Sequence, residues 1–136
     1  MASLKAFIVE DSAVIRDNLV AALEEMVPLK VVGTAEDEAA ALSWLADPGH
    51  DCDIAIVDIY LRRGTGLNVL RALQRGGRTT DRVVLTNYAT DEIRRHALAL
   101  GASRVFDKSG EIDALVDHCI ALSDAAANGH ERPGAA

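Results

Sequence analysis

The stretch DIAIVDIYL, residues 53–61, places a carboxylate directly after a short apolar block. Ile54 to Val57 are four consecutive apolar residues, which is typical of a strand that is buried on both faces. Asp58 follows at once. A charge at the end of a buried strand must be paired, hydrated or bound to a metal ion. The stretch therefore predicts a buried strand that delivers Asp58 to a polar site.

Four other segments share this strand-like composition, rich in Val, Ile and Phe. The five predicted strands cover 4–9, 30–35, 53–57, 82–86 and 104–106. Helical patterns separate them: apolar stripes over 15–26 and 112–120, and less regular segments over 36–46, 65–75 and 90–100. Thr90 is a candidate N-cap for the last of these. Strand and helix alternate five times, which predicts one doubly wound α/β domain with a parallel sheet covered by helices on both faces.

Composition narrows the class of protein further. The 136 residues suit a single domain, predicted over 1–124, and the tail 125–136 lacks an apolar period and is expected to be disordered. The net charge of −7 argues against binding to nucleic acid, so no direct DNA binding is expected. No apolar run approaches membrane-span length and no signal peptide is evident, so a cytoplasmic protein without a membrane contact is expected.

Polar residues lie at or just after the carboxyl ends of four of the predicted strands. They are Glu10, Asp11, Asp58, Thr86 and Lys108. Because parallel strands end at the same edge of a sheet, where ligands of such sheets bind, these side chains are expected to converge. Acidic residues at strand ends also cap the helices that follow, which is an alternative for any one of them. All five at one edge favour a site.

The chemistry of this set suits a cation and a phosphoryl group. Three adjacent carboxylates repel one another and raise one another's pKa unless a cation intervenes. Mg²⁺ prefers a few carboxylate oxygens and often also binds a phosphate. The ammonium of Lys108 suits a phosphoryl oxygen, and the hydroxyl of Thr86 can donate a hydrogen bond to another.

Five short pieces of the chain resemble the receiver domain of two-component response regulators, of the stand-alone single-domain type. They are VEDS (9–12), VDIYLRRGTG (57–66), VVLTNYA (83–89), LALGAS (98–103) and VFDKS (105–109). The resemblance covers about residues 4–123. It implies a flavodoxin-like (βα)5 sandwich with a five-stranded parallel sheet in the order 2-1-3-4-5.

The resemblance also implies a role for each acidic residue. Asp58 would accept a phosphoryl group from a histidine kinase or a histidine phosphotransfer protein. Glu10, Asp11 and Asp58, with the backbone carbonyl of Tyr60, would hold Mg²⁺, for which Mn²⁺ can substitute. A glycine eight residues after the acceptor is also part of the family's pattern, and Gly66 occupies it.

The implied activity is that of a signalling switch rather than of an enzyme with other substrates. Thr86 and Lys108 would contact the phosphoryl group on Asp58. The output would be binding of an unidentified downstream protein or onward transfer of the phosphoryl group. The surface formed by 90–100, 104–106 and 112–120 is the family's usual partner face. The same surface is the family's usual dimer face, so a homodimer is also compatible with the resemblance.

Several positions depart from the family's pattern. Arg62 stands where many members have proline, and it is expected to touch no proposed ligand. Ser109 also replaces a common proline, so the preceding peptide bond is expected to be trans, and Ser109 is a candidate cap for the last helix. Val105 occupies the usual place of a switch aromatic. Phe106, one residue along a strand, is expected to face the other way.

Tyr60 and Tyr88 are expected to flank the phosphoryl site. Two rings there would hinder an attacking water, which predicts a long-lived acyl phosphate; a mere surface location is the alternative. Two other classes of protein are alternatives to such a switch. One is a degenerate receiver that binds partners without phosphorylation. The other is an aspartate-nucleophile phosphatase, which normally needs a second aspartate where Tyr60 stands.

Overall fold

The computed structural model describes residues 3–77 and 79–127. Its strands are β1 (Leu4–Val9), β2 (Leu29–Ala35), β3 (Ile54–Val57), β4 (Asp81–Thr86) and β5 (Arg104–Asp107). Its helices are α1 (Ala13–Met26), α2 (Glu38–Ala46), α3 (Gly66–Arg75), α4 (Asp91–Ala99) and α5 (Ile112–Ala127). Strands and helices alternate as predicted, and each strand boundary lies within one residue of its prediction.

The five strands form one parallel sheet in the order β2-β1-β3-β4-β5, which confirms the predicted topology. The chain passes from β1 outward to β2, and then returns to the other side of β1 to add β3, β4 and β5. The strand order therefore reverses between β1 and β3. This reversal forms a crevice outside the carboxyl ends of these two strands, next to the paired residues Val9 and Val57.

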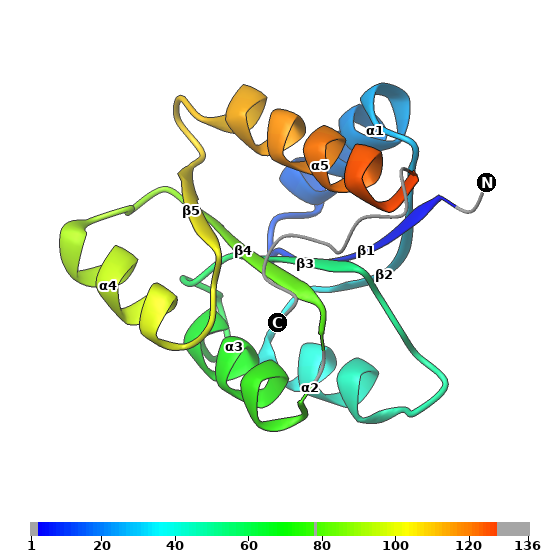
Figure 1. Cartoon of the computed structure of the whole chain (residues 1–136). Helices are drawn as coiled ribbons and strands as arrows, with labels where there is room; N and C mark the ends of the chain where they lie inside the picture. The colour runs from blue at the N-terminus through cyan, green and yellow to red at the C-terminus, as the bar shows by residue number, and fades with distance from the viewer. Residues whose placement is uncertain (1–2, 78, 128–136) are drawn as a thin grey trace.

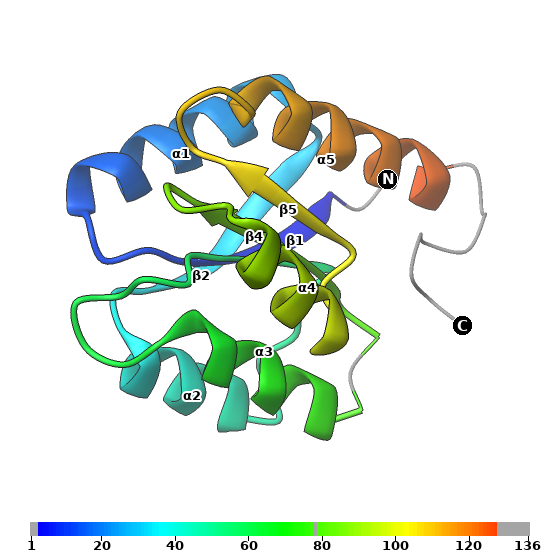
Figure 2. The same ribbon diagram turned by 90° about the vertical axis from the view of Figure 1, so that its left-hand side faces the viewer.

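Helices cover both faces of the sheet (Figures 1 and 2). Side chains of a strand alternate between faces. One core packs Ile8, Ile56 and Phe106 against α1 and α5. The other packs Phe7 and Val105, with their neighbours, against α2, α3 and α4. Phe106 and Val105 thus face opposite layers, as the strand period predicts.

Side-chain oxygens cap α1, α2, α3 and α4 at the residue before the first turn. Ser12 accepts from the N–H of Ile15, and Thr90 accepts from that of Ile93, which confirms Thr90 as an N-cap. Asp37 accepts from the N–H of Ala40 at 2.8 Å. This cap begins α2 at Glu38, two residues later than predicted, since a capping residue has an extended backbone.

The start and the end of α5 differ from the sequence-based expectation. Ser109 does not cap the helix, which begins at Ile112; its hydroxyl instead donates to Asp107 Oδ1 at 2.6 Å. The peptide bond before Ser109 is trans, as predicted. At the other end α5 continues to Ala127, so residues 125–127 of the predicted tail are helical. The remainder of that tail, 128–136, lies outside the described residues.

A stack of three rings joins β1 to α2. The Phe7 and Trp44 rings lie 4.1 Å apart at an interplanar angle of 8°, and His50 stacks on the other side of Trp44 at 4.5 Å. His50 Nδ1 donates to the Trp44 carbonyl at 2.8 Å. A Cβ at Gly33 would lie 2.4 Å from the Trp44 ring, so β2 needs glycine here.

In the described part of the chain, no helix has both the length and the apolar character that crossing a membrane requires.

Candidate functional site: an acidic cluster at the strand ends

The carboxyl ends of β1 and β3 bring three carboxylates together. One oxygen from each of Glu10, Asp11 and Asp58 lies within 4.8 Å of the others. Glu10 and Asp58 are only 2% and 5% exposed, whereas Asp11 is half-buried. The sequence-based expectation that these residues converge is therefore met by the fold.

Backbone hydrogen bonds fix Asp58 in place. Its N–H donates to the carbonyl of Val9 at 3.0 Å, which extends the pairing of β3 with β1 by one residue. Its Oδ1 accepts from the N–H of Tyr60 at 3.2 Å, and its Oδ2 accepts from Lys108 Nζ at 2.7 Å. The carboxylate is thus oriented toward the pocket by a donor on each oxygen.

Gly66 is required by a close approach to the backbone of Asp58. A Cβ at this position would lie 2.0 Å from the Asp58 carbonyl oxygen. The N–H of Gly66 donates to the carbonyl of Ile59 at 2.9 Å, which closes the loop between β3 and α3. Only glycine fits, which gives a steric reason for the glycine eight residues after Asp58.

Lys108 bridges two of the carboxylates. Its Nζ donates to Glu10 Oε1 and to Asp58 Oδ2. Its backbone N–H donates to the carbonyl of Thr86 at 2.9 Å, which brings the ends of β4 and β5 to the same point. Burial alone would lower the pKa of Lys108, but the hydrogen bonds and charges of Asp58 and Glu10 outweigh burial and raise it.

The remaining electrostatics fit a hard divalent cation. Burial raises the pKa of Glu10, and the neighbouring Asp11 carboxyl adds to this; hydrogen bonds from Lys108 and the Ser12 N–H offset it only in part. One ammonium facing three carboxyl groups leaves the cluster with excess negative charge. Such a set of oxygen donors is what Mg²⁺ takes in proteins.

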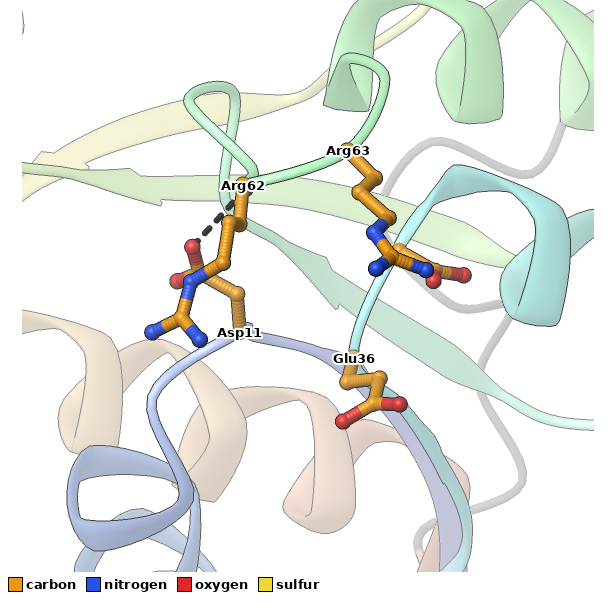
Figure 3. Close-up of a pocket in the computed structure, with 5 residues that line it drawn as sticks. Asp11, Glu36, Arg62 and Arg63 are labelled. Atoms are coloured by element: carbon orange, nitrogen blue, oxygen red, sulfur yellow. Dashed lines mark hydrogen bonds between the residues drawn. The ribbon is translucent and has the colours of Figure 1, made fainter.

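Arg62 contacts a proposed metal ligand, so the expectation that it touches none was wrong. Its backbone N–H donates to Asp11 Oδ2 at 2.8 Å (Figure 3). A proline in this place would have no N–H to donate. Arg62 and Arg63 also line a small polar pocket with Asp11, Glu36 and Asp37, beside the acidic cluster.

Thr86 lines the same pocket as Asp58 and Lys108. It is fully buried, and its Oγ1 accepts from the N–H of Tyr88 at 3.4 Å. The rings of Tyr60 and Tyr88 line the same pocket and meet edge to face with centroids 5.2 Å apart. Both rings flank the site, as expected, and form one contact across it.

Two groups of supporting residues were not predicted. Glu38 in α2 accepts from the N–H of Thr65 at 2.9 Å and from Asn68 Nδ2 at 3.1 Å, so it holds the loop after β3. Arg94 in α4 and Glu111 form an ion pair at 3.4 Å. Nothing in the local sequence marks these side chains, because their partners lie in loops from elsewhere in the chain.

This combination of fold and site defines a class of small α/β domains with an acidic pocket at the strand ends. The model of the response regulator receiver domain matches residues 6–120, and the chain belongs to this family. Receiver domains act as phosphorylation-dependent switches, interact with histidine kinases and generally bind Mg²⁺ through an acidic pocket.

Two curated relatives and one solved structure illustrate the similarity. The DNA-binding transcriptional activator DevR/DosR of Mycobacterium tuberculosis is 34% identical over 100 residues, covering 74% of this chain and 45% of the relative. Protein-glutamate methylesterase/protein-glutamine glutaminase 1 of Pseudomonas savastanoi is 30% identical over 132 residues, covering 92% and 36%. The receiver domain of Francisella response regulator 1452 superposes with a TM-score of 0.79 at 19% identity, covering 91% and 99%.

The chain spans about half the length of the curated transcriptional regulators it matches, and about a third of the methylesterase. The two relatives named above have different activities, so the similarity extends to the receiver domain and not to one shared output.

Proposed function

We propose that this chain is the receiver domain of a response regulator in which Asp58 accepts a phosphoryl group in a Mg²⁺-dependent reaction. The donor is the phosphohistidine of a histidine kinase or of a histidine phosphotransfer protein. The observation that carries the proposal is the position of the Asp58 carboxylate. It lies in an acidic cluster within 4.8 Å of two further carboxylates, with Lys108 Nζ 2.7 Å from its Oδ2.

The reaction is a nucleophilic displacement at phosphorus. A carboxylate oxygen of Asp58 forms the new P–O bond. The P–N bond to the donor histidine breaks, and its electron pair goes to the imidazole nitrogen, which takes up a proton. Orientation of the carboxylate by the Tyr60 N–H and by Lys108 prepares the attack, because a positioned nucleophile loses little further freedom on reacting.

Glu10, Asp11, Asp58 and the backbone carbonyl of Tyr60 would hold the Mg²⁺, for which Mn²⁺ can substitute. The bound ion would neutralise charge on the phosphoryl oxygens during transfer. Lys108 would stay beside Asp58 and pair with one phosphoryl oxygen. The hydroxyl of Thr86, which lines the same pocket, would donate to another.

The proposal includes the output of the switch. The chain catalyses only its own phosphorylation and dephosphorylation, in the cytoplasm, and then binds a downstream protein or passes the phosphoryl group on. The surface of α4, β5 and α5 is the proposed partner face, and it also allows a homodimer. The net charge of −7 supports a protein partner rather than direct contact with DNA.

The test is the intact mass of the protein after incubation with acetyl phosphate and Mg²⁺. One added phosphoryl group is expected, and Mn²⁺ is expected to replace Mg²⁺. An Asp58→Asn protein and a sample treated with a chelator are the matched controls, and neither should gain mass. A wild-type protein that gains no phosphoryl group, with histidine kinases also supplied as donors, would overturn the proposal.

A further inference from the structure

The guanidinium of Arg94, in α4, contacts three separate segments of the chain. Arg94 Nε donates to the carbonyl of Ala89 at 3.1 Å, and Nη1 donates to the carbonyl of Val105 at 2.9 Å. Nη2 lies 3.4 Å from Glu111 Oε1. These partners belong to the loop before α4, to β5 and to the loop before α5, so Arg94 ties α4 to all three.

Two of these contacts lead directly to residues of the phosphorylation site. Ala89 lies in the 87–90 loop, which follows Thr86 and contains Tyr88. The Glu111 carboxylate that meets Arg94 also accepts from the backbone N–H of Asp107 at 2.9 Å, and Asp107 immediately precedes Lys108. The same side chain is therefore linked to the loop after Thr86 and to the 107–111 loop that carries Lys108.

The shape of the guanidinium makes this link stiff. Its donors lie in one plane at fixed angles, so the three acceptors cannot move independently while all the hydrogen bonds persist. At the same time Arg94 and Glu111 are 38% and 39% exposed, so water competes for each contact. A link of this kind can rearrange without unfolding the domain.

Val105 offers no aromatic ring that could connect the 87–90 loop to β5. It stands at the position where an aromatic side chain is usual in the family, and its own side chain packs inward against the α2–α3–α4 layer. Its small side chain has no ring that could swing between two positions. Its carbonyl, however, is held by Arg94.

We propose that Arg94 is a positioning residue that couples the 87–90 loop to the surface formed by β5 and the start of α5. This inference rests on the proposed phosphorylation of Asp58. A phosphoryl group there offers oxygens to the Thr86 hydroxyl, whose Oγ1 now accepts from the Tyr88 N–H. When that hydroxyl turns toward the phosphoryl group, it no longer accepts from the Tyr88 N–H, and the 87–90 loop moves together with the Ala89 carbonyl. The guanidinium of Arg94 then shifts relative to its acceptors in Val105 and Glu111.

The chain offers a matched pair of arginines for the test. Arg94→Leu removes all three contacts. Arg95→Leu changes the neighbouring residue, which is exposed and whose side chain makes no hydrogen bond or ion pair within the described part of the chain. Glu111→Gln is a milder variant, because its amide oxygen can still accept from the Asp107 N–H while the charge facing Arg94 is lost.

The measurement is amide hydrogen exchange over 87–90 and over 104–111, before and after phosphorylation by acetyl phosphate. Without phosphorylation, Arg94→Leu is expected to raise exchange in both segments together, by about fivefold or more, as a local opening would. Arg95→Leu should leave both unchanged. After phosphorylation, the wild type should change exchange in both segments, and Arg94→Leu only in 87–90.

The coupling is overturned if Arg94→Leu, with Asp58 phosphorylated to the wild-type extent, changes exchange over 104–111 as the wild type does. It is equally overturned if Arg95→Leu has the same effect as Arg94→Leu. Should Arg94→Leu not fold, Arg94→Lys replaces it, because a single ammonium cannot span the three acceptors, and a wild-type response over 104–111 in that variant counts against the coupling. A wild type that gains no phosphoryl mass instead refutes the proposed function, and the coupling with it.

Discussion

The two halves of the strand-end pocket are held by different kinds of contact. The half that carries Asp58, the proposed phosphoacceptor, is called the acceptor half. There, backbone groups fix the loop after β3: the Asp58 N–H pairs with Val9, and Gly66 packs directly against the Asp58 carbonyl. The half formed by the loops after β4 and β5 is called the responding half, and these loops are joined through the side chains of Arg94 and Glu111, which are more than a third exposed.

This difference corresponds to two mechanical requirements. A nucleophile works best when its position is fixed before the reaction, because small displacements cost rate. The segments that report the reaction need two arrangements of similar free energy. Buried backbone contacts suit the first requirement, and solvent-exposed side-chain contacts suit the second. The comparison predicts that substitutions that remove buried contacts of the pocket mainly reduce stability, whereas those that remove the exposed Arg94–Glu111 link mainly change the response.

The largest effect is expected from Gly66→Ala. The added Cβ would lie 2.0 Å from the Asp58 carbonyl oxygen, so the backbone of the 58–66 loop must shift. We expect a loss of about 3 kcal/mol or more in the free energy of unfolding, measured by urea denaturation. Gly110→Ala is the control, because nothing lies within 4 Å of a Cβ there. Equal stability of the two variants would show that the acceptor half is not rigid.

The next effect is expected from Lys108→Met, which leaves Glu10 and Asp58 without their shared ammonium. We expect a loss of about 2 kcal/mol at neutral pH, below the cost of breaking a fully buried ion pair because water reaches the pocket. The pKa of Lys108 is raised above 10.5 in the folded state. Its stabilisation is therefore present below pH 10.5 and is lost as the pH rises through the raised value.

Urea unfolding at neutral pH and above pH 10.5 checks this dependence. The difference between wild type and Lys108→Met should shrink as the pH rises above 10.5, since the ammonium loses its proton first in the unfolded chain and, at the raised pKa, in the folded protein as well. A difference that stays constant across this interval would mean that the ion pair is not its source.

A smaller effect is expected from Glu38→Ala, which removes the acceptor for the Thr65 N–H and for Asn68. We expect a loss of about 1 kcal/mol in unfolding free energy, and faster amide exchange over the 58–66 loop. Glu38→Gln keeps an amide oxygen and should recover most of the protection of that loop. If it recovers none, the carboxylate charge and not the hydrogen bonding holds the loop.

The smallest effect concerns the ring contact between Tyr60 and Tyr88, which joins the two halves. Tyr60 follows β3 and Tyr88 follows β4, and their edge-to-face pair is worth about 0.5–1.5 kcal/mol. In the Tyr60→Asn, Tyr88→Ala double variant, water should reach the acyl phosphate more readily, and its decay should quicken several-fold. Decay is followed by intact mass after removal of the phosphodonor, with Leu98→Ala as an exposed control elsewhere. An unchanged rate would assign the rings to surface covering alone.

The sheet and the site differ in how far the sequence could predict them. Strands β1 to β5 follow apolar runs, and the convergence of Glu10, Asp11 and Asp58 follows from where parallel strands end. The end of α5 was placed too early, because its last residues, Ala125 to Ala127, carry no apolar stripe although alanine favours helix.

The contacts that involve backbone donors or distant loops could not be predicted. The Arg62 N–H meets Asp11 only because of the course that the 58–66 loop takes, and the identity of the side chain at 62 says nothing about it. Serine is a residue type that often caps helices, but the hydroxyl of Ser109 donates to Asp107, two residues earlier in the chain. The hydrogen-bond acceptors of Arg94 lie 5, 11 and 17 residues away in the sequence, and no local pattern indicates them.

The stack of Phe7, Trp44 and His50 gives the molecule an optical label of its own. Trp44 is the single tryptophan among the 136 residues, so the tryptophan emission of the chain comes from one ring in one setting. That ring lies against β1, the strand whose end carries Glu10 and Asp11, and it packs between two other rings. Its fluorescence therefore reports whether β1 and α2 are still joined, and unfolding of the acceptor half can be followed without adding a dye.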